Sequence, residues 1–507
     1  MRRVTVVGAL IGAAAAFIGS PALAADLEYK TSPSSYNWTG FYLGINGGYG
    51  LGNDPFDQTN PTPGFPTTVS SINSRVTPQG GLFGGQVGYN LQSGHIVYGL
   101  EGDLQWANQS DTAGCGLDCI SNAGGPATGI AGSAQQWITW FGTARGRLGW
   151  ANDGWLFYIT GGGAWGGIKA TTAASIAPPP VAASETTNLT KSGWAFGGGT
   201  EVRIAGPWTA KIEYLYMDLG SIADTLVLPP PILGPGSLTT NSSIRDHIVR
   251  AGLNYRWDEP TARTGSAGAL PPVVFNWTGF YVGINAGYGL ANDPFSQTQT
   301  NSAPFSPYNS SINSRVTPQG GLFGGQVGYN LQSGHMVYGL EGDLQWANQN
   351  DTAGCGLSCQ TILGGSGGTD LNGSAQQTIT WFGTARGRLG WANDGWLLYI
   401  TGGGAWGGIN ARTADAASAI FSPILTPFTA SETTNFTKSG WVFGGGTEVR
   451  IAGPWTAKVE YLYIDLGNIT DTLPVPAAQG ALFGTTLTTN SSIHDHIVRA
   501  GLNYNFN

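Results

Sequence analysis

The sequence predicts an all-β fold: two transmembrane antiparallel up-and-down β-barrels in tandem, each with eight strands. Three observations lead to this prediction. A block at residues 37–257 recurs at residues 276–507, and each copy contains segments in which apolar and polar residues alternate. Only 10% of the residues are charged, against about 25% in typical soluble domains. A barrel whose outer surface faces lipid needs few surface charges, so it fits this composition.

The first segment is expected to be a secretory signal. Residues 1–24 begin with Arg2 and Arg3, continue as VTVVGALIGAAAAFIG and end in Ala-Leu-Ala. A basic start, an apolar stretch and a small-residue cleavage site are typical of a cleaved signal peptide. The alternative, a membrane helix, needs about 20 apolar residues. Residues 25–36 are predicted to be a short lead into the first unit.

The repeat is a duplicated domain. SINSRVTPQGGLFGGQVGYNLQSGH at 71–95 recurs unchanged at 311–335, and WFGTARGRLGWANDGWL at 140–156 recurs at 381–397. A repeat of this length corresponds to a whole domain rather than to one turn of a solenoid. Residues 258–275 are rich in Pro, Gly and Ala and are therefore expected to form a linker.

Each unit contains eight strand-like segments, recognised by alternation and by aromatic enrichment. In the first unit they are 38–51, 80–92, 95–109, 135–151, 155–170, 191–204, 208–220 and 246–257. Their connections alternate between tight turns, such as Ser93-Gly94, and long polar loops. The loops are expected at about 52–79, 110–134, 171–190 and 221–245. Short turns at one end and long loops at the other are typical of outer-membrane barrels.

The segment at 138–150 determines which face points inward. Ile138, Trp140 and Leu148 fall on one face, and Arg145 and Arg147 fall on the other. An Arg on the lipid face at the bilayer midplane costs about 2–4 kcal/mol. The face with the arginines is therefore predicted to line the interior.

The same argument gives an inward charge network in both units. Its members are Glu101, Asp103, Arg145, Arg147, Glu201, Arg203, Lys211, Glu213 and Arg250, and Glu341, Asp343, Arg386, Arg388, Glu448, Arg450, Lys458, Glu460 and Arg499. Buried charges persist when they are paired, and each unit nearly balances its own. A soluble sandwich is excluded because its other face would expose too large an apolar patch.

Two closing strands predict two closed rings. HIVRAGLNYRW at 247–257 and HIVRAGLNYNF at 496–506 are nearly identical. An open strand edge in lipid leaves backbone groups unsatisfied, so each barrel needs a last strand that pairs with its first. The alternative is one 16-stranded barrel, although a linker of about eighteen residues is long for a turn within one sheet.

The chain resembles the alphaproteobacterial outer-membrane immunogenic proteins, a porin-family or OmpA-like group of β-barrels. The resemblance rests on both units, through NWTGFYLGINGGYG at 37–50, GGLFGGQVGYN at 80–90, LEGDLQWA at 100–107, ARGRLGW at 144–150, EYLYMDLG at 213–220 and HIVRAGLNY at 247–255. It implies a Gram-negative outer membrane, surface-exposed loops and no enzymatic activity. It also implies contact with membrane lipid and lipopolysaccharide, with periplasmic chaperones and with the barrel-insertion machinery. That machinery reads a terminal strand, for which Tyr504 and Phe506 are the candidate signal.

Other motifs favour structural roles. Cys115/Cys119 and Cys355/Cys359 are expected to form local disulfides in an exported protein, and zinc is the alternative, although no His partner lies near. Gly161, Gly163 and Gly166 match a dinucleotide-binding pattern but are not followed by a helical pattern.

The sequence gives little support for catalysis, for ligand binding by the aromatic residues or for nucleic-acid binding. Asp246 and His247 are adjacent and point to opposite faces of a strand, so they cannot form a hydrolase dyad. The aromatic residues fit girdles at the membrane interfaces better than ligand platforms. A net charge of −8 without a basic patch argues against nucleic-acid binding.

The sequence therefore predicts a structural membrane protein, without cofactor, that displays surface loops and conducts little or no solute. The alternative is a porin-like diffusion channel for small hydrophilic solutes. The ligands of the loops and the oligomeric state stay open.

Overall fold

The computed structural model describes most of the two repeated units. The described residues are 36–60, 70–115, 120–121, 129–152, 154–177, 181–228, 236–257, 275–301, 309–354, 360–361, 369–393, 395–419, 428–475 and 485–506. The predicted signal peptide and most of the linker lie outside them. Among the described residues, no helix has the length and apolar character needed to cross a membrane.

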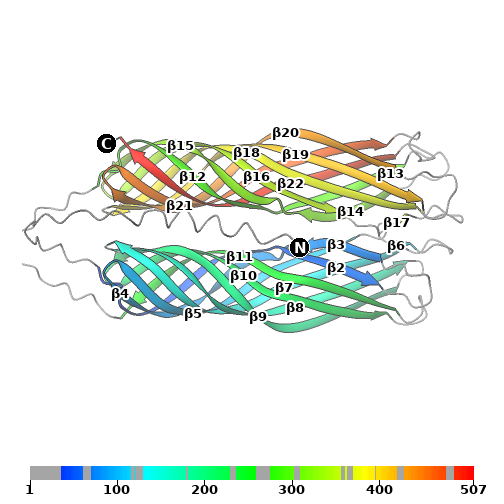
Figure 1. The fold of residues 1–507 in the computed structure, drawn as a ribbon, viewed down its shortest axis with the longest axis horizontal. Coiled ribbons are helices and arrows are strands. Elements are labelled where there is room, and N and C mark those ends of the chain that lie inside the picture. The colour runs from blue at the N-terminus through cyan, green and yellow to red at the C-terminus, as the bar shows by residue number, and fades with distance from the viewer. Residues whose placement is uncertain are drawn as a thin grey trace, which may run out of the picture.

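The first unit is a ring of antiparallel strands that run the length of the barrel (Figure 1). Its strands are β1 (Gly40–Gly52), β2 (Asp54–Asn60), β3 (Ser70–Val76), β4 (Gln79–Ser93), β5 (Ile96–Cys115), β7 (Gly129–Asn152), β8 (Trp155–Ala177), β9 (Val181–Ala205), β10 (Trp208–Leu228) and β11 (Gly236–Arg256). β2 continues β1 after a break at Asn53, and β3 leads into β4. Counting each of these two pairs as one membrane-spanning strand, the ring has eight strands. β6 (Ile120–Ser121) is a short addition beside β7.

The second unit repeats this ring. Its strands are β12 (Gly279–Ala291), β13 (Asp293–Asn301), β14 (Asn309–Val316), β15 (Gln319–Ser333), β16 (Met336–Gly354), β17 (Gln360–Thr361), β18 (Thr369–Asn393), β19 (Trp396–Ala419), β20 (Phe428–Ala452), β21 (Trp455–Val475) and β22 (Thr485–Asn505). β13 continues β12, and β14 leads into β15, as in the first ring.

Each ring closes on itself. β11 pairs with β1, with Arg250 opposite Gly48, and β22 pairs with β12, with Arg499 opposite Gly287. The prediction of two eight-stranded barrels is confirmed, and the alternative of one 16-stranded barrel is wrong. A short backbone pairing between β5 and β14 links the two rings at one end.

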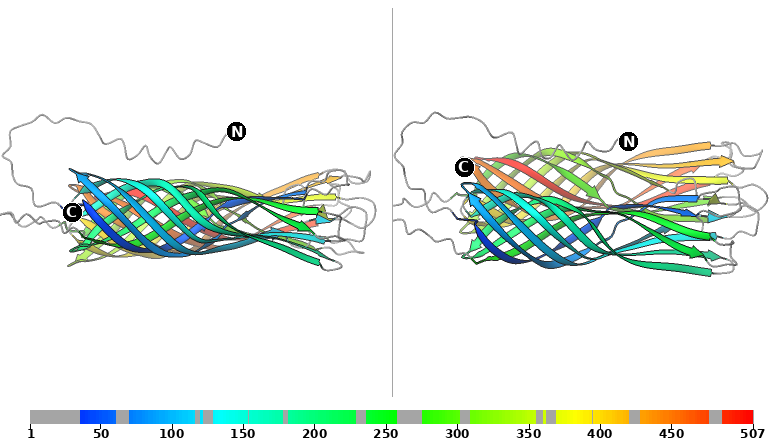
Figure 2. Two further views of the ribbon diagram at one scale, coloured as in Figure 1. Left: turned by 90° about the horizontal axis from the view of Figure 1, so that it is seen from below. Right: turned by 60° about the horizontal axis from the view of Figure 1, so that its bottom comes forward.

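The outer surface carries an apolar band. Leu100 and Leu104 are 72% and 62% exposed, whereas Glu101 between them is 4% exposed. Trp140 and Trp150 on β7 are ten residues apart. At a rise of about 3.3 Å per residue and a tilt of about 40°, they bound a band about 25 Å tall. Figure 2 shows the tilt of the strands.

A β-bulge shifts one side chain from its predicted face. The pairing of β7 with β8 slips between Ile138 and Trp140. Ile138 was predicted to point outward with Trp140, but it is fully buried in the interior. A bulge adds one residue to a strand and so inverts the alternation beyond it.

The strands extend well past the outer edge of the apolar band, and the predicted loop ranges are too long. β8 and β9 pair from Ile168 as far as Ile176 and Val181, within the loop expected at 171–190. Thr is common here and favours strands. Cross-strand hydroxyl pairs support the ladder, with 2.8 Å between the Oγ1 atoms of Thr171 and Thr186.

In these extensions the arrangement of side chains is reversed. Threonines such as Thr171 and Thr186 lie on the outside, while Phe56, Val76, Ala113 and Ala134 pack together inside. A wall surrounded by water buries its apolar side chains, whereas a wall surrounded by lipid exposes them. This reversal places the extensions outside the hydrocarbon layer.

Candidate functional site in the barrel interior

The interior of the first barrel contains a dense ion-pair network centred on Arg145. Its Nη2 lies 2.7 Å from Glu101 Oε1 and 2.8 Å from Asp103 Oδ2, and its Nη1 lies 3.1 Å from Glu213 Oε1. The three acids come from β5 and β10, on either side of the barrel's narrow interior. One guanidinium therefore joins strands that are not neighbours in the sheet.

Three further cations complete the network. Arg250 Nη2 lies 2.8 Å from Asp103 Oδ2, and Arg250 Nε donates to Glu213 Oε2 at 2.7 Å. Lys211 Nζ lies 2.9 Å from Glu101 Oε1. Arg147 Nη2 lies 2.8 Å from Glu201 Oε2. All of these side chains are almost fully buried.

Two tyrosines belong to this network, although the sequence reasoning assigned aromatic residues to the outer girdles. Tyr42 Oη donates to Glu101 Oε2 at 2.8 Å and accepts from Arg147 Nη1 at 3.0 Å. Tyr158 Oη donates to Glu213 Oε1 at 3.0 Å. Tyr42 lies on the same strand face as Asn46, which was a usable signal of an inward position.

The second barrel reproduces the network. Arg386 Nη2 contacts Glu341 and Asp343, and its Nη1 lies 2.9 Å from Glu460 Oε1. The remaining pairs repeat as Lys458 with Glu341, Arg388 with Glu448, and Arg499 with Asp343 and Glu460. Tyr281 and Tyr399 take the tyrosine positions.

Arg203 and Arg450 do not join these networks, which corrects the predicted set. Arg203 is exposed at the barrel end, where its Nε donates to Gly206 O at 3.3 Å. Arg450 donates to Gly453 O at 3.1 Å. Both lie on the predicted inward-facing side of their strands, but at the end of the barrel, past the ion-pair network. Without them each network holds four acids and four bases, so it is electrically balanced.

Apolar layers lie above and below the first network. On the short-turn side, Trp38 is fully buried together with Leu156 and Val97. On the opposite side, Phe141 and Leu215 belong to a larger buried cluster. The second barrel has corresponding clusters. The interior is therefore filled by side chains in layers, as expected for a barrel of eight strands.

The remaining candidate residues are placed as follows. Asp246 is buried inside and accepts from Gln109 Nε2 at 2.8 Å, while the His247 ring faces outward and its Nδ1 lies 2.8 Å from Tyr214 Oη. The two cannot act as a pair. Tyr504 and Phe506 both point outward, with ring centroids 5.2 Å apart.

Two further motifs are placed by the strands. Gly161, Gly163 and Gly166 lie within β8, not in a turn before a helix. The predicted disulfides lie outside the described part of the chain, which includes neither Cys119, Cys355 and Cys359 nor the side chain of Cys115.

Comparisons with known proteins agree with this architecture. The model of the family "Outer membrane protein beta-barrel domain" matches twice, at residues 10–256 and 264–506. The 31 kDa outer-membrane immunogenic protein of Brucella melitensis is 36% identical over 260 residues, which are 49% of this chain and 90% of that protein. The 22 kDa outer membrane protein of Rhizobium leguminosarum is 30% identical over 187 residues, 36% of this chain and 66% of that protein.

Two solved structures are also similar. Ail, the attachment invasion locus protein of Yersinia pestis, matches with 12% identity over 43% of this chain and 99% of its own, at a TM-score of 0.18. Neisserial surface protein A matches with 10% identity over 43% of this chain and 98% of its own, also at 0.18. The family match and the closure of each ring establish the fold without these two structures.

Proposed function

Because the chain belongs to the family of outer-membrane protein β-barrel domains, in two copies, we propose that it is a structural protein of the outer membrane. In this proposal it has no enzymatic role, it presents its extended rims and loops at the cell surface, and it conducts little or no solute. The outward apolar band contacts membrane lipid and lipopolysaccharide. Chaperones and the barrel-insertion machinery deliver the chain.

The filled interior supports this proposal most directly. Arg145, Arg250 and their acids bridge opposite walls at hydrogen-bond distance, and apolar layers with Trp38 and Phe141 lie on either side of them. A hydrated ion or sugar would need a continuous aqueous path. Opening one would require breaking buried ion pairs, each of which is costly to separate.

Planar-bilayer recording on the purified protein tests the proposal. We expect no stable conductance steps, while a 16-stranded porin measured in the same bilayer gives nanosiemens-scale steps. Reproducible steps of that size from this chain would contradict the proposal and support the alternative of a diffusion channel.

Antibody labelling of a tag inserted after Pro178 in whole cells should report surface exposure of that end.

A further inference from the structure

The two barrels meet through a polar cluster in which the ion pair between the barrels occurs twice. Arg75 Nη2 of the first barrel lies 2.9 Å from Asp351 Oδ1 of the second. Arg315 of the second barrel makes the same contact with Asp111 of the first, at 2.8 Å from Nη2 to Oδ1. Arg315 is the repeat equivalent of Arg75, and Asp351 is that of Asp111. The barrels thus exchange the same ion pair in both directions.

A threonine–asparagine hydrogen bond has the same reciprocity. Thr77 Oγ1 donates to Asn292 Oδ1 of the other barrel at 3.2 Å, and its repeat equivalent Thr317 donates to Asn53 Oδ1 at 3.4 Å. Within its own barrel, Asp111 accepts from the Thr77 amide at 2.9 Å. This bond fixes the carboxylate before its partner arrives, which lowers the entropic cost of binding. The Thr317 amide fixes Asp351 in the same way, at 2.9 Å.

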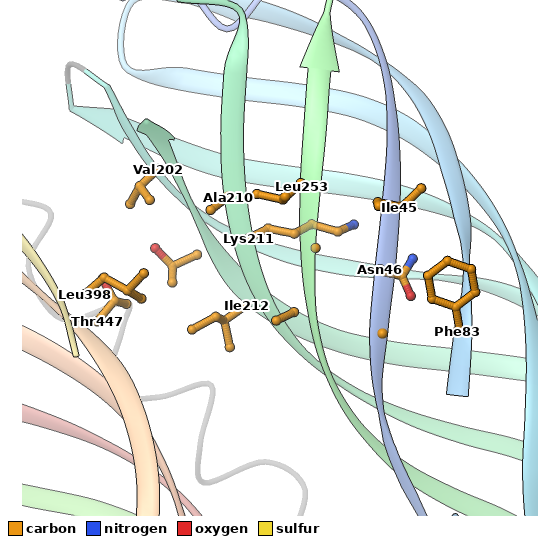
Figure 3. Close-up of a pocket in the computed structure, with 14 residues that line it drawn as sticks. Ile45, Asn46, Phe83, Val202, Ala210, Lys211, Ile212, Leu253, Leu398 and Thr447 are labelled. Atoms are coloured by element: carbon orange, nitrogen blue, oxygen red, sulfur yellow. The ribbon is translucent and has the colours of Figure 1, made fainter. Parts of the chain in front are cut away.

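A second contact lies at the short-turn end and is apolar. Trp155 and Val202 of the first barrel pack with their repeat equivalents Trp396 and Val449. Ala210 and Ala457 flank this cluster, and small residues let neighbouring walls approach closely. Above it, outward side chains such as Ile45, Phe83 and Ile212 line an apolar groove of about 440 Å³, with Leu398 of the second barrel at its edge (Figure 3).

Contacts that pair equivalent residues at both ends define a pseudo-twofold relation. Figure 1 shows both barrels side by side with their short turns at the same end. The pseudo-twofold axis must therefore run along the barrels, which suits two units inserted in one direction. A contact of this type is isologous, so it uses the same patch on both partners and closes after two units.

The location of the polar cluster gives it a special role. Asp111 lies five residues beyond Trp106 of the outer girdle on β5, about 12 Å further from the membrane centre. Inside the bilayer, apolar walls gain little by leaving lipid for one another. Charges in partial contact with water contribute selectivity more than affinity. The polar cluster is therefore the part of the interface that can determine which surface of one barrel binds which surface of the other.

We propose that the two barrels recognise each other as folded units, and that the reciprocal pairs Arg75–Asp351 and Arg315–Asp111 determine which faces meet. The partner of each surface is the other unit of the same chain. The linker raises their local concentration but does not hold the pair in register.

A cleavable linker tests this proposal on the full chain. A protease site is placed within residues 258–274, the folded protein is cut in mild detergent, and the halves are followed by size-exclusion chromatography. We expect the cut halves to elute together. Arg75→Glu with Arg315→Glu should separate them, because each face then carries like charges. Adding Asp111→Arg and Asp351→Arg should restore joint elution, because both pairs are reformed with opposite polarity.

A control variant with the same change in net charge is available. Lys169→Glu with Arg412→Glu reverses two outward cations whose contacts lie within their own barrels, with the Trp137 ring and with Ser431. This variant should elute as the parent does. Protease resistance of each cut half reports folding, and Arg75→Glu alone serves if the double variant misfolds.

Three results would overturn the proposal. The first is separation of the parent halves after cutting, and the second is joint elution of the double reversal. The third is a variant with all four substitutions whose cut halves are folded but elute separately.

Discussion

Replacing Glu213 by glutamine should lower the free energy of unfolding of the first barrel by about 3 kcal/mol, because removing one partner of a buried pair strands the other charge. Glu213 accepts from Arg145, from Arg250 and from Tyr158 at 3.0 Å. Glutamine keeps the shape but loses the charge, and its amide group would face guanidinium donors. The network would then hold four bases and three acids.

Urea unfolding of the full chain in phospholipid vesicles measures this loss. Glu185→Gln, at an exposed position of β9, is the matched control and should change stability by less than about 0.5 kcal/mol. Glu460→Gln should repeat the effect in the second barrel. Glu213→Gln with Arg250→Met restores the charge balance and should recover part of the loss. If Glu213→Gln proves as stable as Glu185→Gln, charge balance does not hold the interior together.

The alternation of residues predicted most of this network, because a regular strand assigns each side chain to a face. Glu101, Asp103 and Arg145 are where the period of two places them. The same rule failed at Ile138, since a bulge is set by pairing with the next strand and leaves no clear mark in one sequence. It also failed for Arg203, because alternation specifies the face of a residue but not its height in the barrel.

The partner surface between the barrels could not be predicted from the sequence. Arg75 and Asp111 fell within segments interpreted as loops, and their partners are 276 and 204 residues away in the chain. Contacts between closed rings follow no local period. The strand extensions beyond the apolar band were interpreted as loops for a related reason. Thr- and Ser-rich stretches are compatible with loops, and they become strands only when a neighbouring strand forms hydrogen bonds with them.

Replacing Gly162 by alanine should destabilise the first barrel by about 3 kcal/mol, at the upper end of the usual cost of overpacking. Gly162 lies opposite Arg145 across the β7–β8 ladder. A Cβ on Gly162 would lie 2.1 Å from the carbonyl oxygen of Ala144 and 2.7 Å from Arg145 Cα. These are backbone atoms, so no rotamer change can make room, and the two strands would have to separate beside the ion-pair network.

Gly146→Ala is the matched control, since Gly146 is next to Arg145 but faces outward. Its Cβ would meet nothing nearer than Gly161 O at 3.9 Å, so its stability should stay within about 0.5 kcal/mol of the parent. Gly403→Ala should repeat the Gly162 result, with the same 2.1 Å approach to Ala385 O. Gly162→Ala and Gly146→Ala are both measured by urea unfolding in vesicles and by bilayer recording.

Equal stability of Gly162→Ala and Gly146→Ala would mean that the wall beside Arg145 has room for an added methyl group. The interior would then be wider than the ion-pair distances require, and the argument against a solute path would lose its main support. A large loss for Gly162→Ala alone, with both proteins electrically silent, would instead show that the glycine is there to let two strands and a guanidinium share one narrow section of the barrel.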